Sequence, residues 1–368
     1  MQQDYDVIVI GARVAGSIVS AFLGQKRHRV LLLDRARFPS DTLSTHFFRY
    51  PTFTVLDRLG ILDQVYSVAP KLVNSFNYVD GHVFTEPVEG QDGPSHYLCV
   101  RRITLDEILL NRVRKEATVS ILENARADNL QYEDGHVIGV RWTKEGKRFT
   151  ATGRVVVGSD GVNSMVAEKV QPAVENSEPV RRAMYYAYYS HFDSQPGPAA
   201  EFHYRGNRLV YVFPTDAGLT LLASSVPIED FAQFRQNSDM NLKLEIESMP
   251  EVRERIGRAE RVGPVKGTGS IPGYQRMPYG PGWALVGDSG QILDPWSGQG
   301  IDQASTHAAL LADALDRWLS GKTSWEESMT EFNRRRHEFS DKTFERTCMF
   351  ARDLRPMTKA ALKKRGYV

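Results

Sequence analysis

Three short segments rich in glycine and aspartate contain the residues that could bind a ligand. The first of them is followed by Asp34 and consists of Gly11, Ala12, Arg13, Val14, Ala15 and Gly16. Backbone amides at a helix start bind a pyrophosphate, small residues allow close approach, and an acid about 20 residues further on accepts ribose hydroxyls. This segment therefore predicts a dinucleotide site. Arg13 replaces the middle glycine of the usual pattern, and we expect it to face the phosphates.

A second segment places an aspartate directly after a hydrophobic run. The run 155–157 is followed by Gly158, Ser159, Asp160 and Gly161. A carboxylate at the carboxyl end of a parallel strand lies where the ligands of α/β folds collect. An Asp-Gly pair is also a common turn, and the segment taken alone favours that simpler interpretation.

A third segment joins an aspartate to the start of a long helix. Asp288 follows the apolar run 283–286, and the helix is opened by Gly298, Gln299, Gly300 and Ile301. Unpaired amides and the positive end of the helix dipole would stabilise negative charge on a ring system there. A glycine-rich loop with a structural cap is the alternative for this segment, but the three segments together favour a cofactor site.

These segments require a parallel sheet whose strand ends meet at one edge. Apolar runs predict its strands at 5–10, 30–33, 155–157 and 283–286, with helices at 14–27 and 299–319. A separate antiparallel sheet is predicted from strands at 183–192, 201–204, 208–213 and 219–226, and a long charged helix from 324 to about 352. The sequence therefore predicts an α/β fold in which a Rossmann-like domain is interleaved with an antiparallel-sheet domain and ends in a C-terminal helical segment.

Composition excludes several classes of protein. The chain has 368 residues with 46 basic and 45 acidic side chains, so it lacks the basic excess of a nucleic-acid-binding protein. Cys99 and Cys348 are too few for a disulfide framework, a zinc site or a cysteine-ligated cluster, which fits the cytoplasm. The apolar run 7–24 contains Arg13 near its centre and is interrupted by Gly11 and Gly16, which favours a strand, a turn and a helix. We therefore expect no membrane span and no metal site.

At this point the order of the segments resembles the FAD-dependent monooxygenases of the aromatic-hydroxylase type, together with their relatives the geranylgeranyl reductases and the flavin halogenases. The resemblance covers nearly the whole chain. It implies non-covalent FAD with Asp34 at the adenosine ribose, Asp288 at the ribityl chain, and the residues from Gly298 to Ile301 at the pyrimidine edge of the flavin. It further places three residues at the cofactors: Arg35 and Arg102 on FAD, and Asp160 where FAD binding is linked to NADH or NADPH.

The order of the predicted elements also divides the chain into domains. The FAD-binding domain is predicted at 1–72, 101–180 and 266–320, the substrate domain at 73–100 and 181–265, and C-terminal helices at 321–368.

The implied reaction is a monooxygenation. NAD(P)H reduces FAD, O2 adds to give a flavin C4a-hydroperoxide, and a hydrophobic or aromatic small molecule is hydroxylated or epoxidised. Ala167 stands where the family usually has arginine, the Trp-x-Trp-x-Ile-Pro signature of the halogenases is missing, and the segment 210–214 is similar to geranylgeranyl reductases. A reductase of carbon-carbon double bonds and a non-enzymatic flavoprotein are therefore the alternatives.

Four side chains are predicted to line the substrate pocket, namely His46, Tyr211, Pro295 and Trp296. A solvated or capping histidine is the alternative for His46, and a core position is the alternative for Trp296. The sequence leaves the substrate, the choice between NADH and NADPH, and the oligomeric state open.

Overall fold

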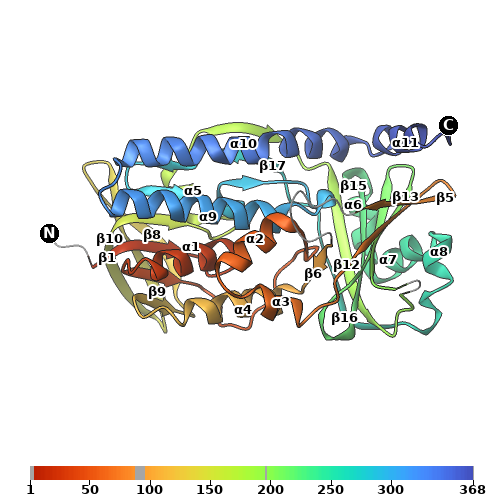
Figure 1. Ribbon diagram of the computed structural model, residues 1–368, viewed down its shortest axis with the longest axis horizontal. Helices are drawn as coiled ribbons and strands as arrows, with labels where there is room; N and C mark the ends of the chain where they lie inside the picture. Colours follow the sequence, from red (N-terminus) through yellow and green to blue (C-terminus); the bar gives the residue numbers. More distant parts are fainter. Residues whose placement is uncertain (1–3, 88–95, 195–196, 368) are drawn as a thin grey trace.

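The computed structural model describes residues 4–87, 96–194 and 197–367 (Figure 1). The predicted strand, helix and strand at the start are confirmed as β1 (Tyr5–Ile10), α1 (Val14–Gln25) and β2 (Val30–Leu33). The two strands pair in parallel, with Val7 opposite Val30. Strand residues 7–10 and 30–33 are all buried, because helices and further strands cover both faces of the sheet.

The first sheet has eight strands and carries the predicted parallel core. Its main path runs β18-β19-β10-β1-β2-β7, and β9 pairs with both β8 and β10. The strands not yet given are β7 (Val119–Leu122), β8 (Arg126–Glu133), β9 (His136–Lys144), β10 (Lys147–Gly158), β18 (Tyr279–Gly280) and β19 (Trp283–Leu285). Because β1, β10 and β19 run parallel, the residues that follow them all reach the same edge of the sheet.

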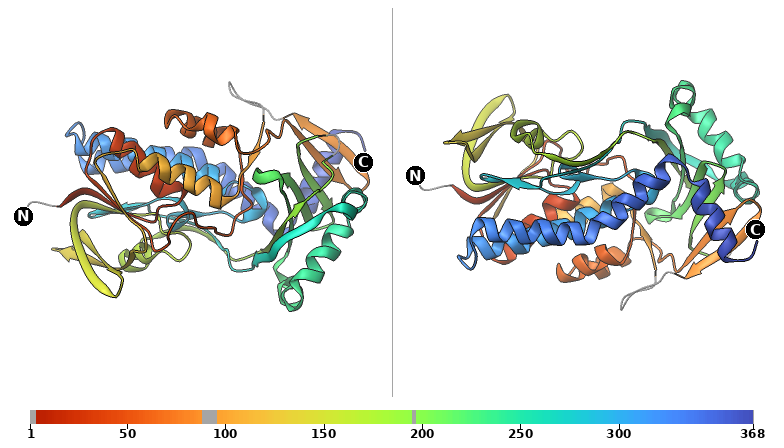
Figure 2. Two further views of the ribbon diagram at one scale, coloured as in Figure 1. Left: turned by 90° about the horizontal axis from the view of Figure 1, so that it is seen from below. Right: turned by 90° about the horizontal axis from the view of Figure 1, so that it is seen from above.

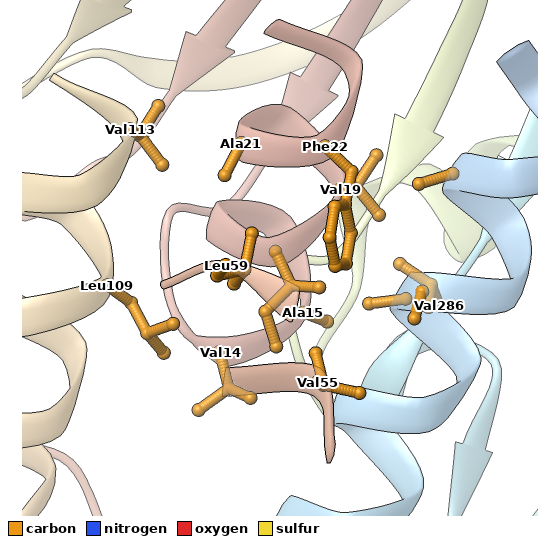
Figure 3. Packing of buried hydrophobic residues seen from close by; sticks show 14 of the residues in the cluster. Val14, Ala15, Val19, Ala21, Phe22, Val55, Leu59, Leu109, Val113 and Val286 are labelled. Carbon is orange, nitrogen blue, oxygen red and sulfur yellow. The ribbon is translucent and has the colours of Figure 1, made fainter. Parts of the chain in front are cut away.

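One face of this sheet is covered by helices from distant parts of the chain. They are α2 (Tyr50–Arg58), α4 (Arg102–Val113) and α9 (Gly300–Leu319); α4 and α9 both contact α1, and α2 contacts α9. Figure 3 shows Leu109 and Val113 of α4 pointing toward α1 from one side, with α9 and Val286 on the other. Burial of each such side chain contributes about 1.5–3 kcal/mol relative to exposure, so this packing fixes where the N-terminal ends of α1 and α9 lie.

A second sheet of seven strands, ordered β16-β12-β15-β14-β13-β4-β5, holds the predicted antiparallel strands. These are β12 (Arg182–Ser190), β13 (Ala199–Arg205), β14 (Arg208–Pro214) and β15 (Thr220–Pro227), and the earlier part of the chain adds β4 (Asn74–Val79) and β5 (His82–Pro87). β4 pairs with β13 in parallel, so the expectation of a purely antiparallel sheet is wrong at that pair. Residues 88–95 of the predicted 73–100 segment lie outside the described ranges.

The edge strand β16 (Glu260–Thr268) was not predicted from the sequence. Its sequence contains Pro264 and two glycines, which argue against a central strand but are tolerated at a sheet edge. The strand extends three residues beyond position 265, where the substrate domain was predicted to end. The domain boundaries remain predictions.

The C-terminal helical segment is confirmed. α10 (Trp325–Arg352) starts with a capping box between Ser324 and Glu327, and α11 (Arg355–Lys364) follows after an extended residue, Asp353. Figure 2 shows α10 lying along α9 and reaching from the first sheet to the second. No helix within the described ranges is both long and apolar enough to cross a bilayer.

Shorter elements lie between those already given. Two of these strands pair as β3 (Phe47–Phe48) with β6 (Leu98–Cys99), and three form a small sheet of β11 (Val174–Glu178), β17 (Gly273–Arg276) and β20 (Gln291–Ile292). The short helices are α3 (Leu62–Tyr66), α5 (Met165–Val170), α6 (Phe231–Gln236), α7 (Ser238–Glu247) and α8 (Pro250–Arg253), with the 3-10 turns η4 (Gly287–Ser289) and η5 (Pro295–Ser297) near the strand ends.

Candidate functional site

The turn between β1 and α1 is built so tightly that only glycine fits at two positions. Gly11 has a φ of +102°, and a Cβ there would lie 2.4 Å from the carbonyl oxygen of Ser159. A Cβ on Gly16 would lie 1.8 Å from the carbonyl oxygen of Gly11. The Arg13 side chain at the N-cap makes no capping hydrogen bond, so the first-turn amides of α1 remain available to an anion.

Asp34 holds this turn from the end of β2. Its Oδ2 accepts a hydrogen bond of 2.7 Å from the Ala12 amide, and its Oδ1 accepts one of 2.7 Å from the Ala36 amide. The carboxylate is therefore fixed beside the start of α1, where a ribose contact was predicted. The neighbouring Arg35 is exposed, and its contact with FAD remains a prediction.

We expected the Arg13 side chain to face the phosphates. In the structure its guanidinium is instead hydrogen-bonded to other groups of the protein. It donates to Asp106 Oδ2 at 2.7 Å and to the carbonyl oxygens of Ser40 and Asp41 at 3.1 and 3.0 Å. Arg102 donates to both oxygens of Asp106 at 3.0 Å. Two cations therefore share one fully buried carboxylate, which leaves a net positive charge beside α1, suited to a pyrophosphate.

Asp106 was missed by the sequence analysis. Its spacing of four residues from Arg102 on one helix face was the available signal, since such pairs contact each other.

Asp160 binds the start of α5, a role that neither the ligand interpretation nor the turn interpretation of its segment predicted. Its Oδ1 accepts a hydrogen bond of 2.5 Å from the Ser164 hydroxyl, and its Oδ2 accepts one of 2.7 Å from the Met165 amide at the start of α5. Both carboxylate oxygens are used inside the protein. A contact with a cofactor from Asp160 remains a prediction.

Asp288, by contrast, presents a free carboxylate. The residue lies in η4 after β19 and is exposed. Its backbone oxygen accepts a hydrogen bond of 2.6 Å from the Tyr274 hydroxyl, but no group in the described parts of the chain donates one to the carboxylate. A charged acceptor without a protein partner, at the edge where the parallel strands end, fits a ligand hydroxyl.

The start of α9 is the second open helix end. Gly298 has a φ of +62°, the exposed Gly300 has no atom within 4 Å of the place a Cβ would take, and Gln299 at the N-cap makes no side-chain capping hydrogen bond. Ile301, the last residue of the predicted group, is buried beneath them.

A second pair of residues that the sequence analysis missed supports the start of α9. Asp302 is buried in the first turn of the helix, and Arg49 lies just before α2. The Arg49 Nε lies 3.0 Å from Asp302 Oδ2. No local spacing signals this contact, because the two residues are 253 positions apart.

His46 is fully buried, so the solvated or capping alternative is wrong. Its Nε2 lies 2.6 Å from the Tyr188 hydroxyl, and its ring stacks on that of Tyr188 with centroids 5.7 Å apart. Desolvation, with Arg102 nearby, lowers the pKa of His46 to about 3, so the imidazole is neutral at physiological pH. Its Nδ1 is buried without a partner among the described residues.

Tyr211 and Trp296 are brought together in a core position. The Tyr211 hydroxyl donates to the Trp296 carbonyl oxygen at 2.7 Å, and the Trp296 indole N–H donates to the Thr347 carbonyl oxygen in α10 at 3.0 Å. Both side chains are buried in one hydrophobic cluster with Tyr186 and Tyr188. Trp296 therefore packs as the core alternative proposed, whereas Pro295 beside it is half-buried.

None of the four predicted pocket residues lines either of two cavities in the structure. One cavity of about 510 Å³ lies between β13 and α8, and the other, of about 520 Å³, is bordered by the segments 67–70, 191–194 and 214–220. The substrate pocket at His46, Tyr211, Pro295 and Trp296 remains a prediction.

Comparisons with known proteins show which sequences and folds this chain resembles. The digeranylgeranylglycerophospholipid reductase 1 of Methanococcoides burtonii is 25% identical over 324 residues, 83% of this chain and 72% of that protein. The structure of the myxobacterial chondrochloren halogenase CndH superposes with a TM-score of 0.84 at 23% identity, covering 93% of this chain and 81% of that one. PqsL, a probable FAD-dependent monooxygenase from Pseudomonas aeruginosa, superposes with a TM-score of 0.77 at 21% identity over 94% and 95% of the two chains.

The resemblance drawn from the sequence is thus confirmed at the level of the superfamily, since reductases, halogenases and monooxygenases all share the fold or the sequence pattern. A family model described as an FAD binding domain matches residues 4–227, which include both the β1–α1 turn and most of the second sheet. The chain belongs to this FAD-binding domain family.

Proposed function

We propose that the protein is an FAD-dependent monooxygenase that uses NADH or NADPH and O2 to hydroxylate or epoxidise a hydrophobic or aromatic small molecule. The observation that carries the proposal is the open Asp288 carboxylate at the same sheet edge as two helix ends without side-chain caps. The family supports FAD as the cofactor.

The residues present fit FAD. The first-turn amides of α1, with the positive charge of Arg13 and Arg102 behind them, would hold the pyrophosphate. Asp34 would take the adenosine ribose, and Asp288 would accept hydrogen bonds from the ribityl hydroxyls. The space beside Gly300, where no protein atom would meet a Cβ, would receive the flavin edge.

When bound, FAD supplies the redox chemistry, taking electrons from the nicotinamide cofactor and reacting with oxygen. The protein binds, orients and excludes water. The first-turn amides of α9 stabilise negative charge at the ring edge, and the aromatic cluster of Tyr186, Tyr188 and Trp296 keeps water from that side of the site. His46 holds the Tyr188 hydroxyl as a neutral partner, so it adds no charge there.

FAD is expected to be bound tightly but non-covalently. Acid denaturation should release a yellow supernatant with the mass of FAD, and the intact protein should be bleached by NADH or NADPH without air and regain its colour in air. Flavin that stays on the precipitated chain would contradict non-covalent binding. A protein that binds FAD but takes no electrons from either nicotinamide would favour the non-enzymatic flavoprotein.

Asp288→Ala should weaken FAD binding more than Asp160→Ala does. A hydrogen bond to a charged group contributes about 1.5–3 kcal/mol, which corresponds to about tenfold or more in affinity. Asp160 instead caps α5, so its loss should mainly lower stability, by about 0.5–2 kcal/mol. Titration of the apoprotein with FAD and thermal unfolding separate the two effects. Wild-type FAD affinity in Asp288→Ala would refute its assignment to the ribityl chain.

A double-bond reductase is the second candidate, favoured by the similarity to digeranylgeranylglycerophospholipid reductase 1. In that reaction a hydride and a proton reach the substrate, and oxygen only diverts electrons. A reductase therefore forms its product better without air. A monooxygenase forms no product without air.

A further inference from the structure

We infer that Arg49 and Asp302 are positioning residues that fix the loop opening α9 and set the reduction potential of bound FAD through their paired charges. The inference rests on the FAD site of the proposed function and not on which reaction the enzyme performs.

Asp302 is turned away from the helix end that its position would normally serve. It is the third residue of α9, where an acidic side chain can reach back to the N-cap. Instead its Oδ1 accepts hydrogen bonds from the Arg49 amide at 3.0 Å and from the Thr52 hydroxyl at 2.7 Å. The first-turn amides of α9 therefore keep no internal carboxylate as partner and remain available to a ligand.

Arg49 connects that carboxylate to the loop before the helix. Its Nη2 donates to the carbonyl oxygens of Ser297 at 3.3 Å and Gly298 at 3.1 Å. With the Gln299 amide oriented so that its oxygen faces Arg49, the Nη1 donates to that oxygen at 2.6 Å. One guanidinium thus contacts the loop 297–299 and the first turn of the helix, and it fixes their relative position as a planar fork can.

The pair also sets the charge near the predicted flavin edge. The Asp302 side chain is 1% exposed and that of Arg49 is 26% exposed, so water screens their charges only partly. Reduced FAD gains negative charge that oxidised FAD lacks. An ionised Asp302 without Arg49 would oppose that charge, whereas Arg49 without the carboxylate would favour it. Because the potential reports the ratio of affinities for reduced and oxidised FAD, each change should shift it.

The two single variants are expected to move the potential in opposite directions. Arg49→Gln should lower it and Asp302→Asn should raise it, each by about a tenfold change in that affinity ratio, as expected for a unit charge within roughly 10 Å at an effective dielectric near 20. Potentials are measured by spectroelectrochemistry on the FAD-loaded protein, at a pH high enough to keep Asp302 ionised, since burial raises the pKa of that carboxyl.

Two further variants separate charge from position. The double variant Arg49→Gln with Asp302→Asn should return the potential close to that of the wild type. Arg49→Lys keeps the charge but loses the fork, so it should leave the potential nearly unchanged while FAD affinity falls severalfold. The matched control is Arg58→Gln with Asp313→Asn, an exposed ion pair of 2.9 Å between α2 and α9, which should change neither quantity.

The outcomes distinguish this inference from the proposed function. Shifts of opposite sign with recovery in the double variant support it. Shifts of the same sign in both single variants, or none, would overturn it even though FAD binds normally. Failure of the wild-type protein to bind FAD would instead refute the proposed function.

Discussion

Replacing Gly16 with alanine is expected to weaken FAD binding and to destabilise the fold. The new Cβ would lie 1.8 Å from the carbonyl oxygen of Gly11 and 2.5 Å from the Ser159 hydroxyl. The obstacle includes backbone, so the β1–α1 turn must shift away from the end of β10. Overpacking of this kind costs about 1–3 kcal/mol, and displacement of the first-turn amides of α1 should weaken FAD binding by about tenfold or more.

Gly257→Ala provides the matched control. Gly257 is exposed, and no atom lies within 4 Å of its added Cβ. Thermal unfolding and titration of the apoproteins with FAD compare the two variants. If Gly16→Ala kept wild-type affinity and stability, the close approach of α1 to β10 would not be what shapes the pyrophosphate site.

Trp296→Ala is expected to lower the free energy of unfolding by about 3–5 kcal/mol, the usual cost of removing a buried aromatic side chain. The sequence analysis placed Trp296 at a pocket wall, from which its loss would mainly admit water. The structure buries it in the cluster with Tyr186 and Tyr188 and ties its indole N–H to Thr347 in α10. The truncation therefore removes contacts between the second sheet and α10, together with the hydrogen bond from the indole N–H to the Thr347 carbonyl.

Trp296→Phe tests whether packing is the cause. It keeps an aromatic ring but no N–H, and it should cost only about 1 kcal/mol, the typical worth of one hydrogen bond. Denaturant unfolding measures both variants. A Trp296→Ala protein as stable as the wild type, with more peroxide released per NADPH, would show that the side chain walls a substrate pocket after all.

Local patterns in the sequence were sufficient for the parallel core. The strand predicted at 5–10 and the one at 30–33 are found with those bounds, because a short apolar run between turn residues is typical of a buried strand. The glycines at 11 and 16 likewise predicted a tight turn, and the structure leaves no room there for a side chain.

Contacts between distant segments could not be read from the sequence. The parallel pairing of β4 with β13 joins residues more than a hundred positions apart. The strand β16 was not predicted because Pro264 argues against a strand, although proline is tolerated at a sheet edge. His46 is buried because Tyr186 and Tyr188 of β12 enclose it, which the polar loop 35–45 before it does not suggest.

The difference between Asp160 and Asp288 shows the same limit within the site. Both follow a strand and precede glycine or serine in the sequence. The structure distinguishes them, because Ser164 and the Met165 amide bind Asp160 while Asp288 has no such partner among the described residues.

Turnover under labelled dioxygen tests the proposed reaction most directly. The FAD-loaded protein is supplied with NADPH or NADH and candidate hydrophobic or aromatic substrates, and the products are analysed by mass spectrometry. The monooxygenase predicts one labelled oxygen atom in the product, with no product in the absence of oxygen. An unlabelled product heavier than the substrate by two hydrogens, formed better without air, would contradict monooxygenation and establish the double-bond reductase.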